Sequence, residues 1–410
     1  MPSLPTLNLP GDPSRVLDPT ETFYVVMSLL VIVYLGLHAL MASHFGRVVI
    51  AIRENEIRCE LLGYDVRLHK LLIFTVGGGT AGLAGCLFAN WGAFVSPTVF
   101  SLAMTSQIII WVIVGGLGTL LGPHHRVPDR AVPHDDVRHP TTCEHQSDLR
   151  DHLSGLRAPR AARPRANAGK VGRPGVRQVA DPQPRMNGAV LETVDLSVRF
   201  GGVEAVRSVN FTLAERELRC LIGPNGAGKS TLFKLLTGQL RPTAGRILFR
   251  GHDITGDHTH AIARRGIGIK SQVPSLFDGL TVREHLWLSA RRTNPAARTR
   301  EIVDEILERM RLTSLASEVV GQFSHGLRQW VELGTVLAGN PTLILLDEPA
   351  AGMTHDEVAR TAELVRDINR THALIVVEHD MQFVKMIART VTVMHQGGVL
   401  VEETPWIGSS

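Results

Sequence analysis

Cysteine is scarce in this chain, and its placement excludes two kinds of architecture. The 410 residues contain four cysteines, Cys59, Cys86, Cys143 and Cys220, and no two of them have C-x-x-C spacing. Neither a zinc cluster nor a framework of disulfide bonds is therefore indicated. We expect these residues to be reduced thiols in a protein that faces the cytosol.

Large apolar residues are missing from one long segment. Residues 122–185 contain no Phe, Tyr, Trp, Ile or Met, but eleven Arg, six His and nine Pro. Their twelve basic and seven acidic side chains give a net charge of +5, whereas the whole chain carries +4 and the remainder therefore about −1. The basic pI belongs to this segment alone and does not indicate nucleic-acid binding by the rest of the chain.

Two interpretations of residues 122–185 compete. A segment of this composition cannot bury a core, which is typical of a disordered basic linker. Alternatively, an apolar run stops abruptly at Leu121-Gly-Pro123, and Arg-, Pro- and His-rich sequence continues to Met186, as in a GC-rich gene translated out of frame. We favour the second interpretation, in which Met186 is the natural start of a separate protein.

Residues 1–121 have the composition of a membrane protein. Two runs of about twenty residues, Thr22–Ala42 and Leu71–Trp91, are long enough to cross a bilayer, and Ser106–Leu121 is a third, shorter run. The glycines of the second run suit close helix packing in lipid. The loop between the first two runs is basic, which places it in the cytoplasm and the N-terminus outside; its basic residues are Arg47, Arg53, Arg58, Arg67 and Lys70. The alternative, buried helices of a soluble domain, is less favoured because such helices are shorter.

Residues 223–231 match G-x-x-x-x-G-K-[ST], the phosphate-binding loop of nucleotide hydrolases. An apolar strand at 217–222 precedes the loop and a helix from Thr231 follows it. Backbone N–H groups of such a loop surround phosphate oxygens, and the helix N-terminus adds positive charge. Lys229 would reach the β- and γ-phosphates, and Ser230 would hold Mg²⁺. The nucleotide-binding residues expected here are Gly223, Pro224, Asn225, Gly226, Ala227, Gly228, Lys229, Ser230 and Thr231.

The surrounding region, residues 186–410, reads as a soluble α/β domain. Residues 190–200 have strand character, and Ile302, Val303, Ile306, Leu307 and Met310 recur at helical spacing. The apolar runs 343–347 and 373–378 are expected to be buried strands of a parallel sheet. Helices alternate with these strands, which favours a P-loop fold.

Acidic residues follow the apolar strand at 343–347. Asp347 would hold Mg²⁺, and Glu348 would act as the base for the attacking water, because phosphoryl transfer needs both beside the γ-phosphate. His379 follows the strand at 373–378, at the carboxyl end where parallel sheets present ligand groups, and would contact the γ-phosphate. Gln272 would contact the metal or the water.

The order of these motifs resembles the ATPase subunits of ABC transporters. The resemblance covers 186–402 and implies a P-loop ATPase domain with a helical subdomain. Within it, Phe200 matches the aromatic residue that stacks on adenine, Gln272 the Q-loop, and His379 the switch histidine. Ser324-His-Gly326 matches the signature sequence, so Ser324 and Gly326 would contact the nucleotide bound by a partner ATPase.

Three segments narrow the resemblance to the importers of branched-chain amino acids and urea: 274–282, 324–330 and 347–354. The sequence around Ser324 is closest to that of the urea branch. Residues 45–58 and 61–65 resemble the cytoplasmic coupling loop of the matching permeases, and 111–123 resembles them too. The resemblance implies a dimer of ATPase subunits that binds ATP and Mg²⁺ at a bacterial inner membrane. Its partners would be a second ATPase subunit, permease subunits and an extracytoplasmic solute-binding protein.

The chain departs from that family at three places. Leu327 stands where the signature ends in Gln, Ile269 and Ser271 replace Arg and Phe of the Q-loop, and 402–410 stops short of a final helix.

We therefore expect three parts: a partial permease with its coupling loop at 1–121, a junction at 122–185, and a truncated ATPase at 186–410. The expected function is ATP hydrolysis for import; the alternative is a fusion or pseudogene product that binds ATP but transports nothing.

Overall fold

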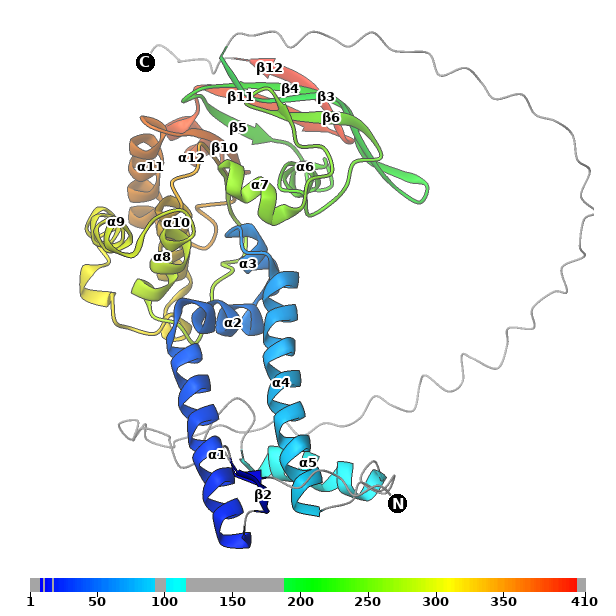
Figure 1. Cartoon of the computed structure of the whole chain (residues 1–410). Coiled ribbons are helices and arrows are strands. Elements are labelled where there is room, and N and C mark those ends of the chain that lie inside the picture. Colours follow the sequence, from blue (N-terminus) through cyan, green and yellow to red (C-terminus); the bar gives the residue numbers. More distant parts are fainter. Residues whose placement is uncertain (1–7, 10–11, 17, 93–100, 116–187, 404–410) are drawn as a thin grey trace, which may run out of the picture. The chain divides into compact units, whose positions relative to one another are not determined.

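The computed structural model describes residues 8–9, 12–16, 18–92, 101–115 and 188–403. These residues are drawn as coloured ribbon in Figure 1. They fall into two units: one takes in the described parts of Met1–Val95 and Pro184–Ser410, the other those of Ser96–Gln183. The predicted junction at 122–185, residues 116–121, Cys143 and the last residues from 404 lie outside the described residues. Among the described cysteines, Cys59, Cys86 and Cys220 are free, and Cys59 and Cys220 are buried.

Two long apolar helices confirm the first two predicted runs. Helix α1 spans Pro19–Ala42, and a capping box of Asp18 and Glu21, with proline at the first position, begins it. Helix α4 spans Val66–Gly92, several residues longer at its start than predicted. The most hydropathic windows of both have no buried residue, and both helices are long enough to cross a membrane. A short antiparallel pair, β1 (Asn8–Leu9) and β2 (Asp12–Val16), precedes α1.

The basic segment between α1 and α4, predicted as a loop, forms two helices. Helix α2 spans His44–Glu54 and begins where the Ser43 hydroxyl accepts a hydrogen bond from the Gly46 N–H. Helix α3 spans Glu56–Leu61, and Asn55 caps it by accepting from the Arg58 N–H at 2.9 Å. Side-chain caps of this kind satisfy the free N–H groups of a first turn.

A six-stranded sheet forms the centre of the α/β region, in the order β12-β11-β5-β10-β9-β8. Strands β8, β9, β10, β5 and β11 are mutually parallel, and only β12 is antiparallel to its neighbour. The predicted strands at 217–222, 343–347 and 373–378 are confirmed as β5, β9 and β10. The bounds are β5 Leu218–Ile222, β8 Ile267–Lys270, β9 Leu343–Asp347, β10 Ala373–Val377, β11 Thr390–His395 and β12 Gly398–Glu403.

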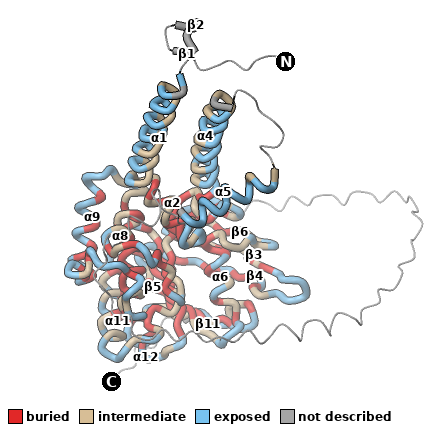
Figure 2. Tube along the Cα trace, turned by 90° about the horizontal axis from the view of Figure 1, so that it is seen from below, coloured by how far each residue is buried: buried red, intermediate tan, exposed pale blue. Residues whose placement is uncertain are grey.

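Both faces of this sheet are buried, which explains why its strands are continuous runs of apolar residues. Along β9, Leu343 and Leu345 belong to one hydrophobic cluster, whereas Ile344 and Leu346 belong to another on the opposite face. Figure 2 shows the buried positions gathered in the α/β region, while α1 and α4 are largely exposed. The helices of this region are α6 Lys229–Leu236, α7 Thr259–Arg265, α8 Val282–Arg291, α9 Ala296–Arg309, α10 His325–Ala338, α11 His355–Asn369 and α12 Met381–Ile387, with short 3-10 turns at Thr313–Leu315 and Val320–Gln322.

A second, four-stranded antiparallel sheet has the order β4-β3-β6-β7. The predicted strand at 190–200 is confirmed as β3 (Ala189–Phe200), which pairs with β4 (Val203–Ala214) across a tight turn. Strands β6 (Ala244–Phe249) and β7 (His252–Asp253) complete it. The predicted amphipathic helix is confirmed as α9, in which Val303, Ile306 and Leu307 are buried.

In the other unit the structure describes one helix, α5 (Leu102–Gly115). It overlaps the third predicted run, Ser106–Leu121, but begins earlier. The described helix has 14 residues, and positions 116–121 of the predicted run lie outside the described residues.

Candidate functional site

Four predicted motifs follow the carboxyl ends of four adjacent parallel strands. The phosphate loop follows β5, Gln272 lies two residues beyond β8, Glu348 follows β9, and His379 lies two residues beyond β10. The register aligns these ends, because Val377 pairs with both Leu221 and Asp347, and Lys270 pairs with Leu346. The topology therefore brings residues that are far apart in the chain to one edge of the sheet.

The phosphate loop runs from the end of β5 into α6, and it depends on glycine. Gly223, Gly226 and Gly228 all have positive φ, a conformation that other residues rarely adopt. At Gly228 a Cβ would also press into the Ala205 carbonyl of β4. Lys229 begins α6, and its Nζ donates to the Gly223 and Pro224 carbonyls at 2.6 and 3.1 Å. Ser230 is exposed beside it.

Asp347 ends β9 in a partly buried position. Burial, and then the adjacent Glu348, raise its pKa to about 6, whereas the charges of Lys270 and Lys229 oppose that rise. Because Leu221 and Asp347 both pair with Val377, the end of β9 lies one strand away from the start of the phosphate loop. Negative charge is concentrated here, where a divalent cation would be favoured.

The Glu348 carboxylate is contacted on both oxygens by predicted site residues. Gln272 Nε2 donates to Glu348 Oε2 at 2.8 Å, and His379 Nδ1 lies 3.4 Å from Glu348 Oε1. The Glu348 side chain is mostly shielded from solvent, whereas that of His379 is 65% exposed. Glu348 itself has φ of +44°, in the left-handed region, which is the kind of strained backbone found at functional sites.

Phe200 lies at the tip of the β3–β4 hairpin and is half exposed. Strand β4 passes the phosphate loop, since the Ala205 carbonyl abuts Gly228. The hairpin thus puts an accessible aromatic ring on the strand pair that borders the loop.

The signature residues lie elsewhere. Ser324 precedes α10 and Gly326 is in its first turn. Helix α10 packs against α8 and α9, and it lies apart from α6 in Figure 1. Within the described part of the chain, no hydrogen bond or ion pair joins Ser324 or Gly326 to the phosphate loop. Ser324 is exposed and Leu327 partly so, which leaves this surface available to another molecule.

Two buried charged residues of this edge were not predicted. Lys270 ends β8 and donates from Nζ to the carbonyls of Ser271, Asp347 and Glu348. Glu378 accepts the Ala350 N–H at 3.1 Å and the His379 N–H at 3.2 Å, so that one carboxylate ties the segment after Glu348 to His379. Charged residues at the ends of apolar strands are the only sequence signal that would have found them.

Helices α2 and α3 pack against the α/β region through a hydrophobic core. Val48, Ala51, Ile52, Cys59, Leu62, Tyr64 and Val66 are buried with Phe277, Leu280 and Leu288. Phe277 and Leu280 follow Gln272 closely in the chain, and Leu288 is on α8. We call residues 44–66 the docking segment, because they lie on the region that follows the Q-loop.

Polar contacts fix the docking segment at its C-terminal end and at the end of α2. The Tyr64 hydroxyl donates to the Leu288 carbonyl at 2.7 Å, and Arg264 Nε donates to the Gly63 carbonyl at 2.8 Å. Glu54 accepts the Gly279 N–H with both oxygens at 3.2 Å. Arg58 was predicted to be one of the charges of a basic cytoplasmic loop. It is instead buried, and its Nη1 lies 3.0 Å from Glu332 Oε1.

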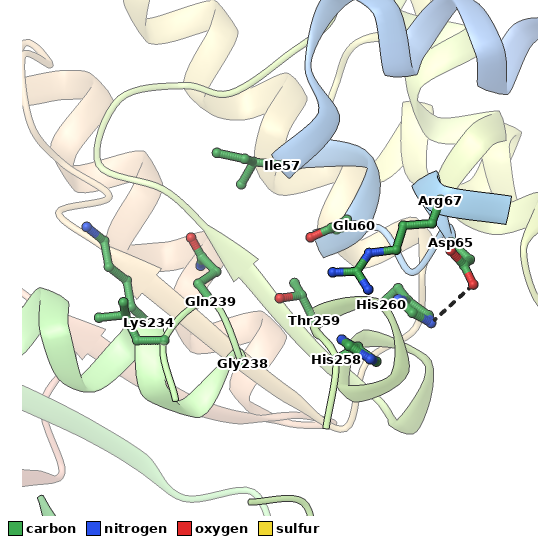
Figure 3. Close-up of a pocket in the computed structure, with 11 residues that line it drawn as sticks. Ile57, Glu60, Asp65, Arg67, Lys234, Gly238, Gln239, His258, Thr259 and His260 are labelled. Carbon is green, nitrogen blue, oxygen red and sulfur yellow. Dashed lines mark ion pairs between the residues drawn. The ribbon is translucent and has the colours of Figure 1, made fainter. Parts of the chain in front are cut away.

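A polar cavity of about 530 Å³ adjoins the docking segment (Figure 3). Glu60, Asp65 and Arg67 line one side, and Lys234 of α6 with His258 and His260 lines the other. Asp65 Oδ2 lies 3.8 Å from His260 Nε2, and the rings of His258 and His260 are stacked. The docking segment therefore lines one side of this cavity, and the phosphate-loop helix α6 contributes to the other side through Lys234.

Comparison with known proteins matches two separate regions of the chain to two families. Residues 206–351 match the ABC transporter family, and residues 8–124 match the family described as branched-chain amino acid transport system / permease component. A nucleotide-free ATP-binding cassette from an ABC transporter is 27% identical in sequence, with a TM-score of 0.48, over 53% of this chain and 91% of that one.

Relatives match over nearly their whole length. The high-affinity branched-chain amino acid transport ATP-binding protein BraF of Pseudomonas aeruginosa is 34% identical over 54% of this chain and 93% of its own. The corresponding protein LivG of Escherichia coli gives the same figures. The lipopolysaccharide export system ATP-binding protein LptB of Haemophilus influenzae is 31% identical over 53% of this chain and 91% of its own. With its nucleotide motifs on adjacent parallel strand ends and this extent of identity, the chain belongs to the ATP-binding ATPases of ABC transporters.

Proposed function

We propose that this chain is an ATP-hydrolysing subunit that powers import of branched-chain amino acids or urea. ATP binding follows from the ABC ATPase domain. Among the substrates, branched-chain amino acids are supported by the permease match and by the transport named for BraF and LivG. Urea as the substrate is supported only by the resemblance of the sequence around Ser324 to the urea branch. The single observation that carries the proposal is the contact of Gln272 and His379 with one carboxylate beside the phosphate loop.

In this proposal each strand end has one task. The loop from Gly223 to Thr231 binds the phosphates, Lys229 neutralises the β- and γ-phosphates, and Phe200 stacks on adenine. Glu348 accepts a proton from the attacking water, while Gln272 and His379 hold its two oxygens in place. A carboxylate fixed by two partners loses little freedom when the water aligns, which lowers the barrier.

The donor set fits Mg²⁺. This cation prefers hard oxygen ligands, which the Ser230 hydroxyl, the Asp347 carboxylate and the side-chain oxygen of Gln272 provide. The pKa of Asp347 is raised by burial and by the negative charge of Glu348, and a bound cation would favour the charged form of the carboxylate against both effects. Bound there, Mg²⁺ would supply charge stabilisation for the transferred phosphoryl group.

We also propose that two ATPase domains share each nucleotide. The separation of Ser324 and Gly326 from the phosphate loop supports this, because those residues would then serve the nucleotide of a second ATPase subunit. The subunit could be identical or related. Leu327 offers no hydrogen bond to that nucleotide, so we expect weaker hydrolysis than with a polar residue there.

The remaining partners follow from the membrane segment. The docking segment suits the coupling of ATPase movement to permease helices, and the apolar surfaces of α1 and α4 suit a bacterial inner membrane. Further permease subunits and an extracytoplasmic solute-binding protein would complete the importer. We propose the parts 1–121, 122–185 and 186–410 as permease fragment, junction and ATPase.

A second candidate is a fusion or pseudogene product that binds ATP but transports nothing. The foreign composition of 122–185 favours it, as does the presence of only two helices of membrane-crossing length among the described residues. Resequencing the gene across codons 118–190 distinguishes the two. A reading frame that encodes clean membrane helices there would support the fusion, and an unaltered sequence would support the junction as real protein.

ATP binding is tested with the purified full chain in lipid nanodiscs. We expect Lys229→Ala to abolish binding of ATP with Mg²⁺, measured with a fluorescent analogue. Lys234→Ala, in the same helix but exposed, is the matched control and should bind normally. Unchanged affinity in Lys229→Ala would remove the site from the phosphate loop.

A further inference from the structure

A cavity of about 300 Å³ lies between the first helix of the docking segment and the helices α8 and α9. Each of the three helices contributes one arginine to its walls, and an indole ring and two small apolar side chains complete them. The lining residues are Arg47 of α2, Arg283 and Trp287 of α8, and Ala296, Arg300 and Val303 of α9. Within the described part of the chain, no acidic residue lines this cavity. Its lining therefore favours an anion.

Most of the positive charge of the cavity has no negative counterpart. Arg283 forms an ion pair with Asp304 of α9, in which Nη1 lies 2.7 Å from Oδ1. Among the residues that the structure describes, Arg47 and Arg300 form no ion pair with a carboxylate. Two of the three guanidinium groups thus keep a charge that a bound anion would neutralise.

Trp287 holds the Arg47 side chain in the wall of the cavity. The guanidinium carbon of Arg47 lies 4.6 Å from the centroid of the Trp287 ring. On the same indole, the His44 ring packs edge to face at 4.9 Å. A guanidinium stacked on an aromatic face keeps the N–H groups along its edge available, and this planar fork matches pairs of phosphate oxygens.

Arg47 also marks where the cavity lies along α1. Its Nη2 lies 3.4 Å from the carbonyl oxygen of Ala42, which is the last residue of the apolar span Thr20–Ala42. A helical span of 23 residues is about 34 Å long, and the hydrocarbon core of a bilayer is about 30 Å thick. In the membrane placement of the proposed function, the Arg47 guanidinium therefore lies among the lipid headgroups on the side of the ATPase.

We propose that this cavity binds the phosphate group of an anionic phospholipid from the leaflet beside the ATPase. The proposal rests on the membrane placement of α1 in the proposed function and adds a ligand which that function does not require. Arg47 bonds the phosphate oxygens through its free edge, and Arg300 neutralises the charge from the opposite helix. A zwitterionic headgroup binds more weakly, because it brings its own cation towards the arginines.

Native mass spectrometry of the full chain in detergent tests the site. We expect the first molecule of phosphatidylglycerol to bind at least about tenfold more tightly than phosphatidylcholine with the same acyl chains, and Arg300→Gln to weaken it about fivefold. Arg298→Gln is the matched control, because this arginine of the same helix already pairs with Glu301 and Glu305. It should bind phosphatidylglycerol as the parental chain does. Equal affinities in Arg300→Gln and Arg298→Gln would overturn the proposal.

Variants of Arg47 separate its charge from its packing. Arg47→Gln should weaken binding of phosphatidylglycerol about fivefold, whereas Arg47→Lys keeps the charge and should retain more of the affinity. Melting temperatures show whether each variant is folded. If Arg47→Gln melts early, Arg300→Gln decides alone, because that side chain is exposed. A folded Arg47→Gln with parental affinity would contradict the proposal.

Competition identifies the source of the phosphate. Inorganic phosphate and glycerol 3-phosphate carry the same group without acyl chains, and we expect neither to displace phosphatidylglycerol at millimolar concentration. Displacement by either would overturn the lipid as the ligand.

Lipid binding is measured without ATP, so its outcome is independent of hydrolysis. A parental chain that enters nanodiscs but does not prefer phosphatidylglycerol would overturn this proposal alone. A chain that stays in solution without detergent would instead overturn the membrane placement in the proposed function.

Discussion

Gln272 donates a hydrogen bond to the carboxylate of Glu348 at 2.8 Å, across 76 positions of sequence. The contact exists because β8 and β9 are adjacent and parallel, so that the residues following them leave the sheet at the same edge. His379, following β10, contacts the other oxygen of Glu348. In the proposed function, this arrangement fixes the carboxylate that accepts a proton from the attacking water.

We expect Glu348→Gln to bind ATP normally and to hydrolyse it at least about 100-fold more slowly, because an amide cannot accept the proton. The shape and the contact with Gln272 are preserved in this variant. Phosphate release and ATP retention on the purified chain measure both effects. Glu363→Gln, at an exposed position of α11, is the control and should hydrolyse ATP at the parental rate. Parental turnover in Glu348→Gln would remove Glu348 as the base.

Gly228→Ala should abolish ATP binding while the chain remains folded. The residue has φ of +101°, and an added methyl group would press into the Ala205 carbonyl, so the loop must move. Gly202→Ala is the matched control, since a Cβ there meets nothing within 4 Å. Equal ATP affinity in the two variants would show that the loop does not need this conformation.

Acid should destabilise the docked region through His285. This side chain accepts the Phe277 N–H at Nε2 and contacts the Thr281 carbonyl through Nδ1, an arrangement that requires the neutral ring. Burial lowers its pKa from 6.5 to about 4. Its stabilising contribution is therefore complete above pH 6.5 and is lost as the pH falls towards 4, by about 3 kcal/mol in all.

Thermal melting between pH 7.5 and 4.5 measures that loss. In His285→Gln the fall in melting temperature should be smaller. Part of the fall should remain, because burial also lowers the pKa of His44 to about 4, and protonation of His44 destabilises the folded chain as well. His355→Gln, which alters an exposed residue, should melt as the parental chain does at every pH. An identical pH dependence in His285→Gln would contradict this assignment.

Much of the ATPase fold could be predicted from the sequence because its signals are local. The phosphate loop, the runs at 343–347 and 373–378 and the spacing of Val303, Ile306 and Leu307 each specify one element through its own residues. Parallel pairing then places Asp347, Glu348 and His379 at one edge without further information.

The buried charges could not be predicted in the same way. Arg58 looks like any other arginine of a basic segment, and its burial depends on Glu332, far away in the sequence. Lys270 likewise ends a four-residue strand, and its three carbonyl partners come from two segments. Long-range pairing of this kind leaves no periodicity in either sequence, so that only the folded chain shows it.

The signature surface provides the last prediction. Leu327 is only partly buried in the first turn of α10, one residue after Gly326, where the resemblance leads us to expect a glutamine. We expect Leu327→Gln to raise ATP hydrolysis about two- to tenfold, because a polar side chain could then bond to the nucleotide held by the partner ATPase. The gain should appear only at protein concentrations at which two ATPase domains associate, followed by light scattering beside phosphate release. Val319→Gln, an exposed apolar residue shortly before α10, controls for added polarity and should leave the rate unchanged. An equal gain at concentrations where the chain is monomeric would argue against a nucleotide shared between two subunits.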